Sequence, residues 1–387
     1  MSGSAEPENA EPDSTEPGSA EPEGPAAAAF AFANGFVNVV ATLPTGARIA
    51  TAGRCGGMSY ASLDHLWAGV PAPHWPARLF APGRVPPDGH LVADLLQRRQ
   101  LDSFRSWSAL RFLTWSVLPD EDRPPLTGVR SLTWAEVPSV LRSLHAGRPV
   151  VLGLVVARGV LRSGDNHQVV AHRADRDASG RLRLHVLDPN HPGEDVTLVP
   201  APDGWVGSDG RRWRGFFRHA YASRRPPELP GASRRPSAAV RAGDALGLLH
   251  VWSGRALAAH GTAAVVAPGP VTAWTVAAAD DPGTRRDEEA AGRRLGDGDR
   301  VRLTRTGTGQ RLTLAPSGPA LAPYAEDVWR VDVEGGGPWR AGSRVRLVHT
   351  GTGRALRVER GRPDRLPVGT GEAGDRAWWT VAERPSP

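Results

Sequence analysis

One cysteine stands where a nucleophile would be useful. Cys55 is the only cysteine among 387 residues, and Gly56 and Gly57 follow it directly. The residues after this pair predict a helix that begins near Cys55. A thiol at a helix start is favoured as the thiolate by the helix dipole and by free backbone N–H groups. The alternative is a small buried hydrophobic residue, because free cysteine is among the most buried residue types.

A cysteine nucleophile needs a base, and the base needs a third group to orient it. The chain has 12 histidines, most of them isolated in loops or in the C-terminal repeats. His167 differs because it begins the apolar run HQVVAH directly after the polar loop Gly164–Asn166. This pattern predicts an imidazole at the rim of a sheet, where it is half exposed.

The residues after His167 are typical of a β-hairpin. Directly opposed residues of an antiparallel pair share a face. If the hairpin is centred between residues 178 and 179, His167 opposes Asn190, and Asp188 lies one step along on the same face. A shift of two residues brings Asp188 opposite His167, whereas an odd shift would separate them. The candidate catalytic residues are therefore Cys55, His167 and either Asp188 or Asn190.

The elements that would position these residues change type along the chain. Helices are predicted after Cys55, over residues 89–117 and over residues 133–145, the last with a Ser/Thr-x-x-Glu capping box. Pro149–Ala157 is a continuous apolar run that predicts a strand buried on both faces. Further strands follow up to Tyr221. Helices first and a mostly antiparallel sheet second predict an α+β domain.

The order cysteine, histidine, then aspartate or asparagine resembles that of papain-like cysteine peptidases. The segments RCGGMSYASLDHL and NHQVVAH…LHVLDPN are most similar to the bacteriocin leader-processing branch and to uncharacterised bacterial proteins with a CGGM motif. The resemblance covers about residues 30–222. It implies that Cys55 attacks a carbonyl, that His167 is the base and that Asp188 orients the imidazole.

One departure concerns the oxyanion hole. Papain-like enzymes usually have a glutamine donor about six residues before the cysteine, but Ile49 occupies that position and no glutamine precedes Cys55. The N–H of Cys55 could supply one donor, and Asn34 or Asn38 the other. Loss of one donor typically slows the reaction about 100- to 1,000-fold. The departure favours a weak hydrolase, a transferase or a degenerate enzyme.

Composition argues against several other classes. One cysteine cannot form an intrachain disulfide, and the chain has no lysine for a phosphate-binding loop. The net charge of +6 comes from arginines scattered among acids, without the basic stripe of a nucleic-acid binder. A zinc site built on His167, His172, His185 and His191 is disfavoured because the first two face opposite sides of a strand. We expect no metal, no cofactor and no nucleic-acid partner.

The sequence also predicts neither a membrane span nor a signal peptide. No segment has the roughly 18 uncharged apolar residues of a membrane span. An acidic stretch precedes the most apolar segment, residues 26–43, where a signal peptide would be basic. We therefore expect a soluble, cytoplasmic protein. Residues 1–27 repeat a Glu-Pro theme and are predicted to be a disordered acidic tail.

Beyond a Pro/Arg-rich linker at residues 224–238, the sequence repeats itself. Three copies start near Gly243, Gly298 and Gly342, and each closes on a tryptophan followed by a short apolar strand. Such a period predicts a three-fold all-β unit. The pattern resembles a MIR-type β-trefoil over residues 239–385. The resemblance implies that this unit binds a substrate, a protein partner or a glycan.

The expected fold class is an α+β papain-like domain at residues 28–223 followed by an all-β trefoil. The favoured function is a papain-like cysteine hydrolase, most simply a peptidase, acting on a peptide or protein through a Cys-His-Asp triad. Two alternatives remain. One is a non-catalytic binding protein with a degenerate papain-like scaffold, and the other is an acyltransferase that uses the same nucleophile.

Overall fold

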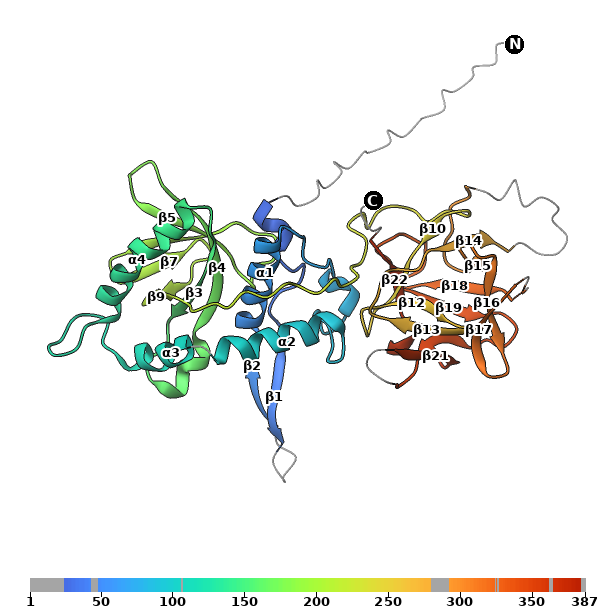
Figure 1. The fold of residues 1–387 in the computed structure, drawn as a ribbon, viewed down its shortest axis with the longest axis horizontal. Coiled ribbons are helices and arrows are strands. Elements are labelled where there is room, and N and C mark those ends of the chain that lie inside the picture. The colour runs from blue at the N-terminus through green and yellow to red at the C-terminus, as the bar shows by residue number, and fades with distance from the viewer. Residues whose placement is uncertain are drawn as a thin grey trace, which may run out of the picture.

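The computed structural model describes residues 24–42, 48–105, 107–279, 292–323, 325, 327–361 and 365–383. Two large β-sheets lie at opposite ends of the molecule, and the helices gather around the first of them (Figure 1). Of the predicted acidic tail, residues 1–23 lie outside the described residues. Gly24–Ala28 form the short 3-10 helix η1, in which Ala28 is buried.

The α-helices of the described chain all belong to its first half. They are α1 (Cys55–Ala68), α2 (Leu91–Phe104), α3 (Trp107–Val117) and α4 (Val129–His145). The predicted capping box of α4 is wrong, because Gly128 precedes the first helical residue and Thr133 lies inside the helix. The Thr133 hydroxyl donates to the carbonyl of Val129 one turn earlier (2.8 Å), a local bond that competes with capping.

The first sheet has seven antiparallel strands in the order β8-β7-β6-β5-β4-β3-β9. Their bounds are β3 (Val150–Val155), β4 (His167–Arg176), β5 (Leu182–Leu187), β6 (Val196–Ala201), β7 (Gly204–Gly207), β8 (Arg212–Trp213) and β9 (Gly215–Arg218). Helices cover both faces. Tyr60 of α1 packs against Val151 and Val170, and Val140 of α4 packs against Leu152 on the opposite face. The apolar run at β3 is buried on both sides because helices cover both faces of the sheet at this strand.

A separate two-stranded ribbon precedes α1. It consists of β1 (Val37–Thr42) and β2 (Arg48–Ala52), which pair antiparallel and project away from the helices in Figure 1. The ribbon leads directly into the N-terminus of α1, since only Gly53 and Arg54 separate β2 from Cys55.

A closed ring of strands forms the core of the second half. In the ring, β10 and β11 act as one bent strand, in which β10 pairs with β14 and β11 pairs with β22. From β14 the ring closes by the pairings β14–β15, β15–β18, β18–β19 and β19–β22. Three hairpins, β12–β13, β16–β17 and β20–β21, attach to it. This is the arrangement of a β-trefoil. We call residues 239–383 the three-fold barrel.

The strands of the three-fold barrel are β10 (Ala245–Leu246), β11 (Leu248–His250), β12 (Arg255–His260), β13 (Ala263–Ala267), β14 (Trp274–Ala278), β15 (Arg300–Arg305), β16 (Gln310–Ala315), β17 (Gly318–Pro323), β18 (Trp329–Val333), β19 (Val345–His349), β20 (Ala355–Val358), β21 (Leu366–Gly371) and β22 (Trp379–Val381). The closing tryptophans are equivalent and fully buried. Each indole N–H donates to a leucine carbonyl of its own repeat: Trp274 to Leu257, Trp329 to Leu312 and Trp379 to Leu356 (3.2, 3.1 and 3.0 Å).

The two halves share one hydrophobic cluster. It joins Trp75 and Leu96 of the first half to Leu249 and Trp378 of the barrel. Backbone bonds cross the same boundary, for example from the N–H of Leu91 to the carbonyl of Ser253 (3.1 Å). The predicted linker takes part as well. Within it, Ala232 is buried, donates to the carbonyl of His74 (2.7 Å) and forms a β-bridge with Ala382.

The predicted fold class is wrong. The described residues are mostly β, in a seven-stranded and a thirteen-stranded sheet, and the α-helices are a minority. A papain-like α+β domain is not evident. Local periodicity indicates the type of an element, but it does not determine how elements assemble. Among the described residues, no helix has both the length and the apolar character needed to cross a bilayer.

Candidate active site

Cys55 is the first residue of α1, and its side chain is partly exposed. The glycines after it let α1 approach α2 closely, because a Cβ added at Gly57 would lie 2.1 Å from the carbonyl oxygen of Leu96. The N–H of Gly57 donates to Oε1 of Gln100 on α2 (2.7 Å). The glycine pair therefore fixes the first turn of α1 against α2, with Cys55 at its free end.

His167 is the first residue of β4 and is buried. The backbone before it is held by Asn166, whose Oδ1 accepts the N–H groups of Val156 and Ala157 (2.9 and 3.0 Å). The imidazole stacks on the indole of Trp213, with ring centroids 5.9 Å apart and an angle of 13° between the planes. Both the backbone and the ring of His167 are thus fixed in place.

Asp188 lies just beyond the end of β5 and is also buried. Its Oδ1 lies 2.7 Å from Nε2 of His167. The same oxygen accepts the backbone N–H of Asn190 (2.8 Å), and Nδ2 of Asn190 lies 3.3 Å from Nε2. Asp188 therefore orients the imidazole, Asn190 supports Asp188, and Nδ1 is the ring nitrogen left for Cys55.

A β-bulge brings these two side chains to one face. Close to the turn, Arg176 opposes Leu182; continued to the start of β4, this register would place Asp188 and His167 on opposite faces. The register shifts between Ala171 and Arg173, so that His172 is the extra residue of β4. Beyond the bulge, the register is the one predicted from a turn centre between residues 178 and 179. The predicted turn centre was wrong, because the register on the turn side of the bulge differs from the predicted one by one residue.

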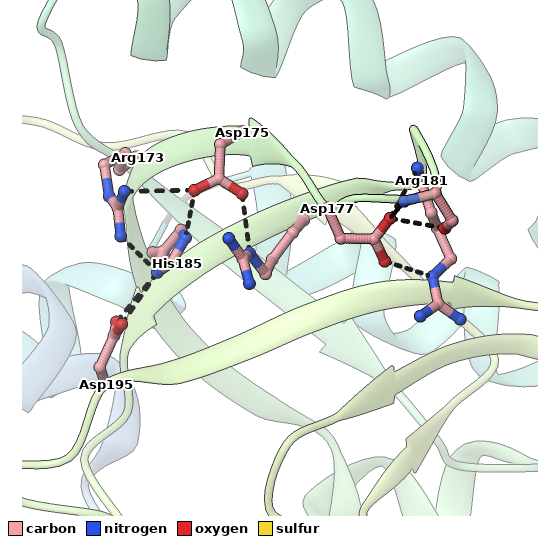
Figure 2. A network of polar contacts seen from close by, with 8 residues as sticks. Arg173, Asp175, Asp177, Arg181, His185 and Asp195 are labelled. Atoms are coloured by element: carbon pink, nitrogen blue, oxygen red, sulfur yellow. Dashed lines mark hydrogen bonds and ion pairs between the residues drawn. The ribbon is translucent and has the colours of Figure 1, made fainter.

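Polar contacts lock the hairpin on the turn side of the bulge (Figure 2). His185 on β5 lies between two carboxylates, with Nε2 2.9 Å from Asp175 and Nδ1 3.0 Å from Asp195. Asp177 accepts the N–H of Arg181 across the turn (3.0 Å). These contacts hold β4 and β5 in register, so the shift occurs at the bulge and not at the turn.

The charges of the site favour a thiolate beside an imidazolium. Burial alone would raise the pKa of the Cys55 thiol, but the hydrogen bond and charge of His167, with the N–H groups of Gln168 and Gly56, lower it below its ordinary value. Burial would lower the pKa of His167, yet Asp188 and Cys55 raise it to about 9. Burial also acts to raise the pKa of the Asp188 carboxyl, and His167 outweighs it and holds that pKa below its usual range.

Comparison with known proteins gives no close relative. No family model matches the chain, and no curated protein matches it. An SDF2-like protein from Arabidopsis thaliana aligns with 38% of this chain and 96% of its own, at 21% identity and a TM-score of 0.32. A Caenorhabditis elegans protein of unknown function aligns with 39% of this chain and 98% of its own, at 19% identity and a TM-score of 0.32.

The S. cerevisiae protein O-mannosyltransferase complex bound to its sugar donor aligns with 43% of this chain and 27% of its own, at 18% identity and a TM-score of 0.31. Values this low carry no argument about activity. The resemblance to papain-like cysteine peptidases is nevertheless wrong as a family assignment: no family model and no curated protein matches the chain, and no peptidase is named among these similar structures. A cysteine, a histidine and an aspartate in one chain order describe a site, and the same constellation recurs on unrelated folds.

A second cluster beside the site has the chemistry of metal ligands. Asp188, His191 and Asp209 place three ligand atoms within 4.8 Å of one another. His191 pairs with Asp209 through Nε2 and with Glu194 through Nδ1, both at 3.4 Å. Because Asp188 is also held by His167, these ion pairs account for the cluster, and we assign no metal to it.

Sequence reasoning missed two residues that shape the site. Trp213 lay only within the further strands predicted up to Tyr221, and nothing in the sequence pairs it with His167. Gln100 was one polar position in a predicted helix, and its role depends on the close approach of α2 to Gly57. By contrast, Cys55 and His167 carried signals in their own local sequence.

Proposed function

We propose that Cys55 is the nucleophile of an acyl-transfer site, with His167 as base and acid and Asp188 as the residue that orients the imidazole. One observation carries the proposal. His167 is held by Asp188 through Nε2 (2.7 Å), and its interaction with the Cys55 thiol lowers the pKa of the thiol and raises the pKa of the imidazole, which reaches about 9. A nucleophile, its base and an orienting group in contact are the arrangement that activates a weak nucleophile.

The chemistry follows from these contacts. The Cys55 thiolate attacks an acyl carbonyl, and His167 donates its proton to the leaving group as the tetrahedral intermediate collapses to a thioester. An acceptor with an O–H or N–H group then gives its proton to His167 and attacks the thioester carbonyl. The second collapse releases the acylated acceptor and returns the thiolate. Asp188 keeps the imidazolium charge paired through both steps.

Trapping the thioester tests this proposal. Incubation with p-nitrophenyl acetate at neutral pH should acetylate Cys55, seen by mass spectrometry of the intact chain and its peptides. The acetyl group should then pass to an added amine. Cys55→Ser should lose both events while it keeps the wild-type melting temperature. Acetylation of Cys55 no faster than that of free cysteine would overturn the proposal.

The three-fold barrel supports a second candidate function, which is ligand binding. Trp252, Arg357, Glu372, Asp375 and Arg376 surround a hollow of about 320 Å³. One aromatic ring among charges of both signs suits a ligand with many hydroxyl groups, such as a glycan. In this proposal residues 28–223 carry the thiol site, residues 239–385 bind the ligand, and residues 224–238 connect them.

A glycan array tests the binding function independently of Cys55. Wild-type protein and Cys55→Ser should bind the same glycans, whereas Trp252→Ala should lose them. Trp107→Ala is the matched control, because Trp107 is an exposed tryptophan on α3 and not part of the barrel. Equal binding by Trp252→Ala and wild type would contradict the assignment of the hollow.

A further inference from the structure

The proposed acyl transfer lacks one assigned group, the side-chain donor of the oxyanion hole. A tetrahedral intermediate develops negative charge on the carbonyl oxygen, and preorganised N–H donors stabilise it. The position where a glutamine was expected is Ile49. The N–H of Cys55 meets no acceptor among the described residues, so it supplies one donor. The question is which side chain supplies the other.

Asn34 lies against the backbone that leads into Cys55. Its Oδ1 accepts the N–H of Arg54, the residue before the cysteine (2.5 Å). Its own N–H donates to the carbonyl of Pro189, the residue after Asp188 (2.9 Å). Asn34 is thus tied to both sides of the site, to the nucleophile's backbone and to the loop that orients the imidazole.

These contacts also fix the orientation of the amide. An N–H donor must face an oxygen, so the bond from Arg54 assigns Oδ1 and leaves Nδ2 on the other side. A Cβ added at Gly53 would lie 2.6 Å from Nδ2, which places this nitrogen beside the chain just before Cys55. Gly53 has a φ of 82°, and its N–H donates to the carbonyl of Phe36 (2.7 Å). The close approach therefore depends on a glycine.

Three other amides lie near Cys55, and none of them contacts the backbone that leads into it as Asn34 does. Gln100 accepts the N–H of Gly57 through Oε1 and is buried. Gln168 is buried on β4, its Nε2 lies 2.8 Å from a Cβ built on Gly56, and its Oε1 has no hydrogen-bond partner among the described residues. Asn190 faces Nε2 of His167, on the far side of the ring from the thiol. Asn34 is half-buried, and within the described chain its Nδ2 donates to no acceptor.

We propose that Asn34 Nδ2 is the second oxyanion donor, acting with the N–H of Cys55. This inference rests on the proposed acyl transfer and names a further catalytic residue for it. The donor comes from a segment before the β1–β2 ribbon and not from the residues just ahead of the cysteine. The Arg54 and Pro189 contacts preorganise it, so no reorganisation is needed when the charge develops.

Two reactions of the same thiol separate the roles. Alkylation by iodoacetamide needs only the thiolate, whereas acetylation by p-nitrophenyl acetate passes through an oxyanion. Asn34→Ala removes the amide, and Asn34→Asp keeps the oxygen that Arg54 needs but removes the Nδ2 donor. Asn38→Asp introduces the same change four residues along the chain and is the matched control. Each rate is measured at the pH plateau of the variant, which removes any effect of charge on the thiol pKa.

We expect both Asn34 variants to acetylate about 100- to 1,000-fold more slowly than wild type, with alkylation unchanged within threefold and Asn38→Asp like wild type. Acetylation within threefold of wild type in either Asn34 variant would overturn the assignment. A parallel loss of alkylation in both variants would also overturn it, because Asn34 would then act on the thiolate. If wild-type Cys55 itself shows no enhanced acetylation, the acyl-transfer proposal fails first.

Discussion

The β4–β5 hairpin carries two histidine–aspartate pairs, one on each side of the bulge at His172. In the first, His167 contacts Asp188 at 2.7 Å, and both side chains are buried. In the second, His185 lies 2.9 Å from Asp175 and is equally buried. By residue type and distance the pairs are nearly identical. Their surroundings are not.

The neighbours of each histidine decide what it can do. The free side of His167 faces the Cys55 thiol, with Trp213 stacked on the ring. His185 instead meets Asp195 and the guanidinium of Arg173, so each of its ring nitrogens already has a partner. The second pair holds a turn together, whereas the first leaves one nitrogen available for proton transfer. A buried His–Asp contact is therefore not evidence of catalysis without a third, reactive group.

The largest contrast should come from exchanging each histidine for asparagine. His167→Asn removes the base and the cation beside the thiol, so acetylation of Cys55 at neutral pH should fall about 100- to 10,000-fold. His185→Asn should leave the acetylation rate unchanged. Stopped-flow release of p-nitrophenol measures both. Equal losses in the two variants would show that the hairpin fold, and not His167, controls the thiol.

Substitution of the two aspartates should show the same contrast, with a large loss of acetylation at Asp188 and none at Asp175. Asp188→Asn presents an amide to Nε2 and favours the wrong imidazole tautomer, which typically costs up to about 10,000-fold where a carboxylate orients the base. The pKa of His167 should fall from about 9, because its main anionic partner is gone. Asp175→Asn is the control and should change neither quantity. NMR titration of the His167 ring reports the pKa.

The site was partly readable from sequence for a physical reason. Cys55 and His167 carry local signals, a thiol at a helix start and an imidazole at a strand start. Asp188 was predicted from the rule that opposed residues of a hairpin share a face. The predicted face was right only because the bulge at His172 shifts the register by one residue, which compensates for the wrong turn centre. Asn34 could be named but not placed, and the stacking of Trp213 could not be foreseen, because both contacts join distant segments. The family and fold class failed because short motifs do not encode topology.

A smaller effect is expected from Gly57, the glycine that allows α1 and α2 to pack closely. Gly57→Ala places a Cβ against the carbonyl of Leu96, and overpacking of this kind costs about 1–3 kcal/mol. The free energy of unfolding in urea should fall by that amount, and Cys55 acetylation should slow because the helix start is displaced. Gly69→Ala is a useful comparison at the other end of α1, where an added Cβ meets no atom and only the φ of 65° is strained. A larger loss there would contradict the packing argument.

The smallest effect concerns the turn of the hairpin. Hydrogen bonds from Ser179 and Arg181 lower the pKa of Asp177 below 3.8. A carboxyl with a depressed pKa stabilises the fold above its unfolded pKa, and this contribution is lost as pH falls toward the folded value. Asp177→Asn should therefore slightly lower the melting temperature at neutral pH and make it less sensitive to acid. Cys55 acetylation should not change.

The pH dependence of Cys55 alkylation by iodoacetamide tests the central claim most directly. In wild-type protein the rate should reach a first plateau well below pH 9.0, the ordinary pKa of a cysteine thiol, because the His167 imidazolium stabilises the thiolate. A second rise is expected near pH 9, where His167 loses its proton. His167→Asn should show one step, at or above pH 9.0, because burial then acts on the thiol without the imidazolium. A wild-type profile with that single step would contradict the account.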